Sequence, residues 1–205
     1  LSVCALLLLS GLAAAAQNKR RSRALLAVLN DSTRGVVSVQ RGPNGRGFFA
    51  KIQPPPEPFR QFIITYHAAS NLNLLGVLLR PLTRRADRMV IHGQLVAHPN
   101  AELIWMRGRV PSRALGKERG AALWVQHRLD FVNAEYATRG INPSALAHVF
   151  ADLQTRFGHW LYKVSIQGDD IPEMEIVLTT SRLNPEEMSA LVTTLRAAGR
   201  AALLR

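Results

Sequence analysis

Residues 142–167 read NPSALAHVFADLQTRFGHWLYKVSIQ and lie in the part of the chain with the clearest secondary-structure pattern. Asn142 and Pro143 supply a helix N-cap and a first-turn proline. Apolar residues then recur at helical spacing until Gly158, and a run typical of a strand, 162–167, follows the glycine. The apolar positions are Leu146, Val149, Phe150, Leu153 and Phe157. The stretch therefore predicts an amphipathic helix that leads directly into a strand.

The residues that follow extend this arrangement. A second strand over 173–180 is separated from the first by a turn at 168–172. Asn184-Pro185 then begins another helix, with two glutamates in the first turn, where the helix dipole favours acids. Its predicted buried stripe is Met188, Leu191, Val192 and Leu195. Because hairpins dominate the predicted strand pairs, we expect an α+β fold with a mostly antiparallel sheet and helices on one face.

Further strands are predicted toward the N-terminus. Their ranges are 36–40, 47–52, 59–66, 89–95, 103–110 and 123–131. Pro43-Asn44-Gly45 marks a hairpin turn between the first two of these strands. His98-Pro99-Asn100 is expected to link 89–95 to 103–110. A short helix is expected over 72–79, and Pro81 ends it.

An uncharged, apolar segment opens the chain as LSVCALLLLSGLAAAA, residues 1–16, and QNKRRSR, residues 17–23, follows it with four basic side chains. Because cytoplasmic flanks of membrane helices collect Lys and Arg, this order favours a single-pass anchor with the N-terminus outside. The apolar run is shorter than the roughly 20 residues that cross a bilayer, so the anchor would be a truncated one. The expected organisation is a transmembrane anchor at 1–18, a basic juxtamembrane segment at 19–34 and a cytoplasmic α+β domain at 35–205.

The same segment allows a second interpretation. The alanines at 13–16, ahead of Gln17, resemble the small residues of a signal-peptidase site, which would make the segment a removed export signal. Under that interpretation the rest of the chain is an exported domain whose basic surface binds polyanions. The cations directly after the cut oppose translocation, so we favour the retained anchor.

Basic residues are concentrated beside the apolar segment. The chain has a formal net charge of +12, and residues 1–51 hold eight Lys or Arg against the single acid Asp31. Each cation near an anionic leaflet is stabilised by about 1 kcal/mol, so these residues are expected to meet lipid headgroups. A second basic group flanks the helix expected at 72–79, where a solvated face is the plain alternative. The predicted membrane-surface or partner contacts are Lys19, Arg20, Arg21, Arg23, Arg80, Arg84, Arg85 and Arg88.

The sequence predicts no catalytic, cofactor or metal site, and hence no enzyme. Its six histidines are scattered, and none pairs with another at metal-ligand spacing on one helix. A single Cys excludes internal disulfides and a Cys-based zinc site. Nucleic acid is kept as an alternative partner, from the positive charge and from RGFFA at 46–50, which is distantly similar to the aromatic strand of an RNA-recognition motif.

Three parts of the chain carry a family resemblance: NLNLLGVLLRPLTRRADRMVIHGQL (71–95), FADLQTRFGHWLYKVSIQ (150–167), and MEIVLTT (174–180) followed by NPEEMSALVTTLRAAGRAALLR (184–205). In the order and pattern of elements, residues 59–205 resemble the cytosolic domain of calumin, the coiled-coil subunit of the endoplasmic-reticulum PAT (protein associated with the translocon) complex. The resemblance implies a non-enzymatic accessory factor or chaperone in membrane-protein insertion. The quoted parts do not include the basic coiled coil with which that family reaches the ribosome, so ribosome contact is not expected.

These observations lead to a main prediction and two alternatives. The main prediction is a single-pass membrane protein whose cytoplasmic domain binds other membrane proteins, as a biogenesis factor or as an accessory subunit of a membrane complex. The first alternative is the exported polyanion-binding domain. The second is a lipid- or small-ligand-binding module with a pocket between the sheet and the helices expected at 143–157 and 185–203.

Overall fold

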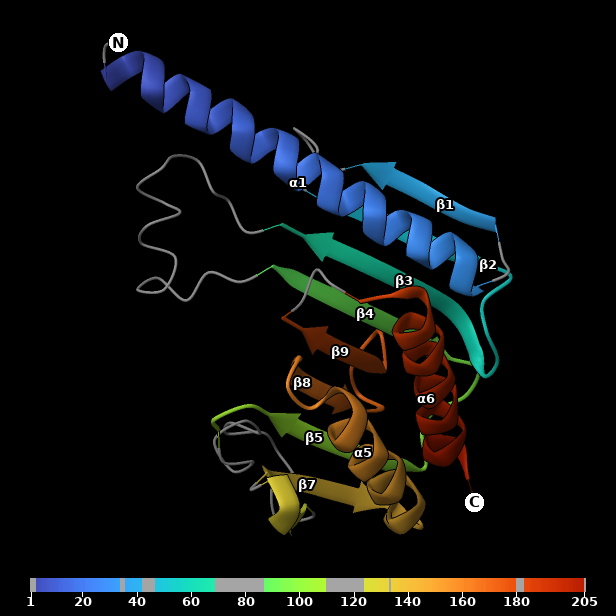
Figure 1. The fold of residues 1–205 in the computed structure, drawn as a ribbon. Helices are drawn as coiled ribbons and strands as arrows, with labels where there is room; N and C mark the ends of the chain where they lie inside the picture. The colour runs from blue at the N-terminus through green and yellow to red at the C-terminus, as the bar shows by residue number, and fades with distance from the viewer. Residues whose placement is uncertain are drawn as a thin grey trace.

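The fold has two layers, a sheet and the helices that cover one of its faces (Figure 1). The computed structural model describes residues 3–33, 36–41, 47–68, 87–109, 124–132, 134–179 and 183–204. The strands are β1 (Val36–Arg41), β2 (Gly47–Gln53), β3 (Phe59–His67), β4 (Arg88–Leu95), β5 (Ala101–Met106), β6 (Val125–Leu129), β7 (Ala134–Gly140), β8 (Leu161–Ile166) and β9 (Met174–Leu178). The helices are α1 (Val3–Thr33), α5 (Pro143–Phe157) and α6 (Pro185–Leu203), with a 3-10 helix η3 (Asp130–Val132). The predicted α+β class is confirmed.

All neighbouring strands of the sheet run antiparallel, in the order β1-β2-β3-β4-β9-β8-β5-β7-β6. Residues 98–100 link β4 to β5 as predicted, but these two strands are not paired, because β9 and β8 lie between them in the sheet. Asn100 in their connection is instead bound to the end of α6. Its backbone N–H donates to Ala202 O (2.7 Å), and its side-chain Nδ2 donates to Leu203 O (3.0 Å).

Two strand predictions also need correction. β5 ends at Met106, before the predicted limit of 110, because residues 107–109 form a turn in which Arg109 N donates to Met106 O (3.2 Å). Gly108 takes a positive φ of 68° in that turn, a conformation that favours glycine. β7 was not predicted, although it pairs with both β5 and β6.

The two C-terminal helices begin at the predicted prolines, but their caps differ. Asn184 forms the full capping box, since its Oδ1 accepts from Glu187 N (2.7 Å) and its own N–H donates to Glu187 Oε2 (2.8 Å). Asn142 adopts a left-handed conformation, with φ of 52°, and its side chain makes no cap hydrogen bond. It accepts from Ser144 Oγ instead (2.9 Å). Asn142 is therefore the N-cap residue and Pro143 follows it in the first turn, as predicted, but the Asn142 side chain does not cap the helix.

α1 is one continuous helix through both the apolar and the basic N-terminal segments. In its second half, Leu25 and Leu29 are buried in the same core as the sheet and α6, at 2% and 0% exposure. Asn18 and Ser22 are buried on the same stripe. The predicted basic segment is therefore helical as far as residue 33, and its Leu25 and Leu29 pack against the protein itself. Among the described residues, no helix has the length and apolarity needed to cross a membrane.

The main core lies between the three helices and the facing side of the sheet. Its largest fully buried side chains include Phe62 and Ile64 on β3, Ile91 on β4 and Leu153 on α5. The alternating burial along β3 and β4 leaves their other side chains on the helix-free face. The turn at 43–45, the helix expected at 72–79 with Pro81, and Arg80, Arg84 and Arg85 lie outside the described residues.

Candidate functional site

One end of the sheet gathers most of the candidate residues, and we call it the basic end. It is the end where β3, β5 and β9 finish and where β4, β7 and β8 begin. The first half of α1 projects beyond the sheet there (Figure 1). The strand ends that face one another are His67 with Arg88, Met89 with Leu178, Met106 with Lys163, and Leu129 with Ala134.

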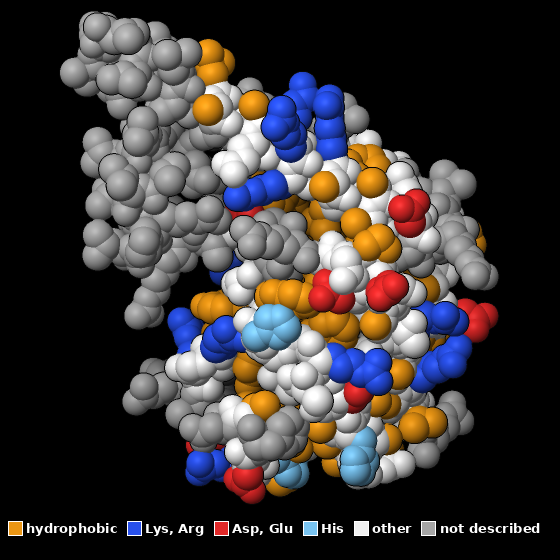
Figure 2. All heavy atoms as spheres, viewed as in Figure 1, with side chains coloured by type: hydrophobic (Ala, Val, Ile, Leu, Met, Phe, Trp, Pro, Cys, Tyr) orange, Lys and Arg blue, Asp and Glu red, His pale blue; other side chains and the backbone are white. Residues whose placement is uncertain are grey.

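The predicted cations of α1 lie where the helix meets this end. Lys19, Arg20 and Arg23 are exposed. Arg21 is partly buried, and its Nη1 donates to Asp87 Oδ2 at 3.2 Å, a carboxylate that is only 3% exposed. Figure 2 shows Lys and Arg side chains gathered over the middle of α1 and again at the left margin of the sheet. The Arg21–Asp87 pair therefore joins α1 to the residue that precedes β4.

Arg88, the described member of the second predicted group, is exposed beside that pair. Its guanidinium carbon lies 5.3 Å from the centre of the Tyr162 ring on β8, within the range of a cation–π contact. The structure thus brings Arg88 and the α1 cations together at the basic end, although 60 or more residues separate them in the chain.

Three further residues of the basic end were not predicted from the sequence. Arg107 and Arg109 follow β5 and are exposed, as is His159, which follows α5. The Nη2 of Arg107 donates to Gly158 O, and the His159 ring lies 4.0 Å from that of Trp160, centre to centre. Their positions depend on the pairing of β5 with β8 rather than β4, which no local pattern in the sequence indicated. Two carboxylates lie at the same end, Asp130 in η3, which pairs with Arg128 (3.5 Å), and Glu135 on β7.

A cavity of about 540 Å³ opens among these residues. Trp105 and Arg107 line it from the end of β5, Ala134 and Glu135 from the start of β7, and Gln154 from α5. Gln154 and Trp105 are buried, at 4% and 5% exposure. The position of Gln154 on the buried stripe of α5, four residues after Phe150, was a visible signal in the sequence.

A second cavity, of about 340 Å³, is a groove on the helix-free face of the sheet. Among the described residues, its lining holds no Lys, Arg, Asp or Glu side chain. Burial lowers the pKa of the His92 imidazole below its usual value, with Glu175 acting against it and Lys163 in the same direction, which favours the neutral ring at neutral pH. Ile171 stands at its edge with 81% of its surface exposed. The lining residues are Phe49, Gln61, Ile63, Thr65, His92, Gln94, Ile171 and Pro172.

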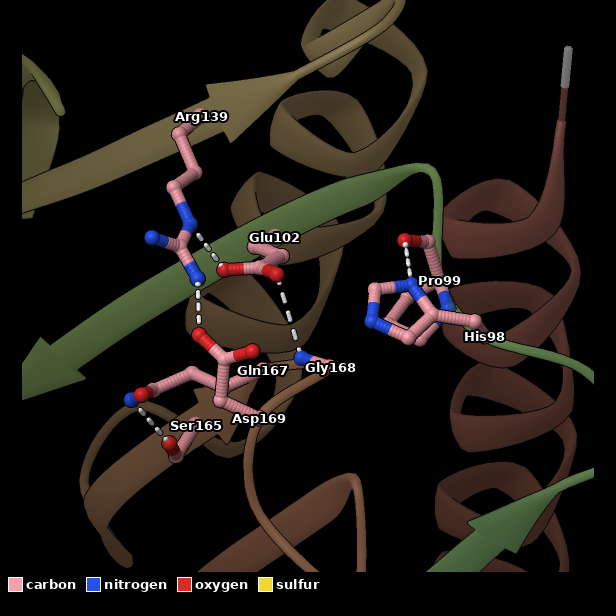
Figure 3. A network of polar contacts seen from close by, with 8 residues as sticks. All are labelled: His98, Pro99, Glu102, Arg139, Ser165, Gln167, Gly168 and Asp169. Carbon is pink, nitrogen blue, oxygen red and sulfur yellow. Dashed lines mark hydrogen bonds and ion pairs between the residues drawn. The ribbon is translucent and has the colours of Figure 1, made fainter. Parts of the chain in front are cut away.

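A network of hydrogen bonds and ion pairs lies at the opposite end of the sheet (Figure 3). The buried carboxylate of Glu102 on β5 accepts hydrogen bonds from Arg139 Nε and from Gly168 N (3.1 Å). Arg139 also donates to Asp169 Oδ2 (2.8 Å) and lies over the Trp124 ring, 4.9 Å from its centre. The hydrogen bond to Glu102 raises the pKa of the Arg139 guanidinium above its usual value. This network joins β5 and β7 to the β8–β9 turn, and its contacts are structural.

In the described part of the chain, no three His, Cys, Asp or Glu side chains come together as metal ligands would. His127 forms a hydrogen bond with Thr138 (2.8 Å) and His98 with Pro99 O (2.9 Å), and both bonds are ordinary structural ones.

No known family model matches this chain, and no curated protein matches it. The basic end, its cavity and the groove are therefore the features that a proposed function has to explain.

Proposed function

We propose that the chain is a membrane-associated, non-enzymatic binding protein, held by α1 at an anionic membrane surface while its α+β domain binds another membrane protein. The observation that carries the proposal is the course of α1. Its uncharged first half leaves the domain at the basic end, and Lys19, Arg20 and Arg23 are exposed where it does so. In this arrangement the apolar half enters the membrane and the cations meet the headgroups.

The position of the other cations supports the same orientation. Arg88, Arg107 and Arg109 are exposed at the strand ends on the side toward which α1 projects. The basic end of the sheet can therefore contact the same membrane surface into which α1 inserts. The charge rule favours the cytoplasmic side for the domain, with the N-terminus outside, as in a single-pass protein.

The helix-free face supports binding of a protein partner. Phe49, Ile63 and Ile171 present apolar surface around a groove whose described lining holds no Lys, Arg, Asp or Glu side chain. An exposed apolar groove of this kind suits an uncharged, apolar segment of another protein, because each buried aliphatic or aromatic side chain contributes about 1.5–3 kcal/mol. This chemistry is that of membrane-protein segments, which agrees with the resemblance of residues 59–205 to the cytosolic domain of calumin. The proposed role is therefore a biogenesis factor or an accessory subunit of a membrane complex.

Photo-cross-linking from the groove tests this proposal. Benzoylphenylalanine is placed at Ile171 in the full chain, in native membranes. It is expected to cross-link to an integral membrane protein, that is, one that is released from the membrane only by detergent. In the same chain Phe49→Ser should lower the cross-linked yield about tenfold, because the contact loses an aromatic side chain worth about 1.5 kcal/mol or more.

Val125 provides the matched control position, since it is an exposed aliphatic residue, at 59%, on the edge strand β6. Benzoylphenylalanine there should give no such product. Equal products from both positions, or products only with soluble proteins, would contradict a membrane-protein partner at the groove.

A further inference from the structure

The cavity at the basic end contains a buried hydrogen-bond donor without an acceptor. Gln154 on α5 is 4% exposed and lines the cavity. Among the described residues its Nε2 has no hydrogen-bond partner. The other amide atom, Oε1, lies close to Gly158. A Cβ atom added to this glycine would be 3.0 Å from that oxygen. A buried amide donor is costly when unpaired, so this geometry suits a ligand that offers an oxygen acceptor.

The charge around the cavity favours an anionic ligand. Arg107 and Arg109 stand at its rim, and His159 lines it beside them. The hydrogen bond from Arg107 to Gly158 O fixes that guanidinium close to the end of α5 and leaves its other N–H groups available for an anion. Glu135 is the one carboxylate among the described lining residues, so positive charge exceeds negative charge.

The inner wall is apolar. Trp105 is 5% exposed, with its ring packed 5.8 Å from that of Phe150, and Ala134 is 7% exposed. Val132 adds a side chain that is partly exposed to solvent. The cavity thus combines a cationic rim, a single amide donor and an apolar wall, within a volume typical of small-ligand sites.

We propose that this cavity binds a phosphate ester, with the phosphate at Arg107 and Arg109, an ester or hydroxyl oxygen at Gln154 Nε2, and the uncharged remainder against Trp105. Both a phospholipid headgroup and a soluble phosphate monoester have this chemistry. The cavity lies at the end of the sheet toward which α1 projects, which favours the lipid. That choice of source rests on the proposed membrane function, whereas the phosphate-ester site itself does not.

Titration of the full chain with monomeric ligands tests the site without a membrane. The probes are dihexanoylphosphatidylglycerol below its micelle concentration, glycerol 3-phosphate and inorganic phosphate, followed by calorimetry and by Trp fluorescence. Saturable binding is expected for the short-chain lipid, with weaker binding of glycerol 3-phosphate and none of inorganic phosphate at equal concentration. Equal affinity for the lipid and glycerol 3-phosphate would support the site and identify a soluble ester as its occupant.

Gln154→Leu is the decisive variant. It removes the unpaired donor while keeping the volume, so binding should weaken about tenfold or more while the unfolding midpoint stays the same or rises. Arg107→Gln with Arg109→Gln should weaken binding at least as much. Arg196→Gln with Arg200→Gln, on α6, removes the same charge away from the cavity and should leave binding within about twofold.

Three results would overturn the site, and two of them come from the variants. One is unchanged binding in Gln154→Leu, and the other is an equal loss in the α6 control variant, which would indicate unspecific charge attraction. Absence of saturable binding to all three probes would also overturn it. Because the probes are monomers, failure of the chain to bind vesicles, with titration intact, would remove the proposed membrane function alone.

Discussion

Replacing Arg139 by Met is expected to lower the free energy of unfolding by about 3 kcal/mol. Glu102 would remain buried, with 7% of its side chain exposed, and among the described residues it would keep only the hydrogen bond from Gly168 N. Loss of one partner from a buried ion pair costs about 3–5 kcal/mol, and the lower end applies because 20% of the Arg139 side chain is exposed. The cation–π contact with Trp124 is lost as well. Urea unfolding followed by circular dichroism measures the change.

Two comparisons separate the buried pair from a general effect of losing an arginine. Arg156→Met makes the same change in the Arg156–Asp152 pair on α5, where both side chains are about half exposed (55% and 44%), and should cost less than about 1 kcal/mol. Glu102→Gln combined with Arg139→Met removes the unpaired charge but keeps an acceptor for Gly168 N. The double variant should be more stable than Arg139→Met alone. Equal losses from Arg139→Met and Arg156→Met would contradict the structural role of the network.

Replacing Lys19, Arg20 and Arg23 together by Gln is expected to weaken binding to anionic vesicles about 100-fold. Each cation near a phosphatidylserine-rich surface contributes about 1 kcal/mol, so three contribute about 3 kcal/mol. Arg21 is left in place because its bond to Asp87 joins α1 to β4. Flotation of the full chain with vesicles that contain 30 mol% phosphatidylserine, over a range of lipid concentrations, measures the change.

A second triple variant of equal charge provides the control for this experiment. The variant replaces three arginines that lie away from the basic end, Arg60, Arg196 and Arg200. Arg60 pairs with Glu173, and the other two approach Glu57. Their replacement by Gln should change vesicle binding less than about threefold, the difference left by a general change in net charge. Raising the salt concentration should weaken vesicle binding of the unmodified chain until it approaches that of the first triple variant. Equal losses in the two triple variants would contradict a membrane-facing basic end.

Local signals in the sequence predicted the elements well where one segment determines them. The spacing from Leu146 to Phe157 and the Asn184-Pro185 start fix α5 and α6, because amphipathic stripes and capping boxes depend on neighbouring residues. The order of strands could not be predicted in the same way. β4 and β5 are separated by β9 and β8, which come much later in the chain, and Asn100 between them bonds to Leu203, 103 positions away.

The candidate site shows the same division. The composition predicts the cations of α1 as contact residues. The same helix also has a buried stripe at four-three-four spacing, which was not predicted from the sequence: Asn18, Ser22, Leu25 and Leu29. Gln154 likewise stands on an apolar stripe, where a polar residue is unusual enough to indicate a site. Arg107 and Arg109 could not be placed, because the end of β5 depends on its partners in the sheet.

The orientation of the domain at a membrane is measured most directly by spin labels at its two ends. In a Cys4→Ser background, His159→Cys labels the basic end and Ile141→Cys labels an exposed position beyond β7 at the opposite end. With vesicles that carry a nickel-chelating lipid, the nitroxide at 159 should relax several-fold faster than the one at 141, because only the basic end lies near the headgroups. Equal relaxation at both positions, or faster relaxation at 141, would contradict the proposal that the basic end faces the membrane.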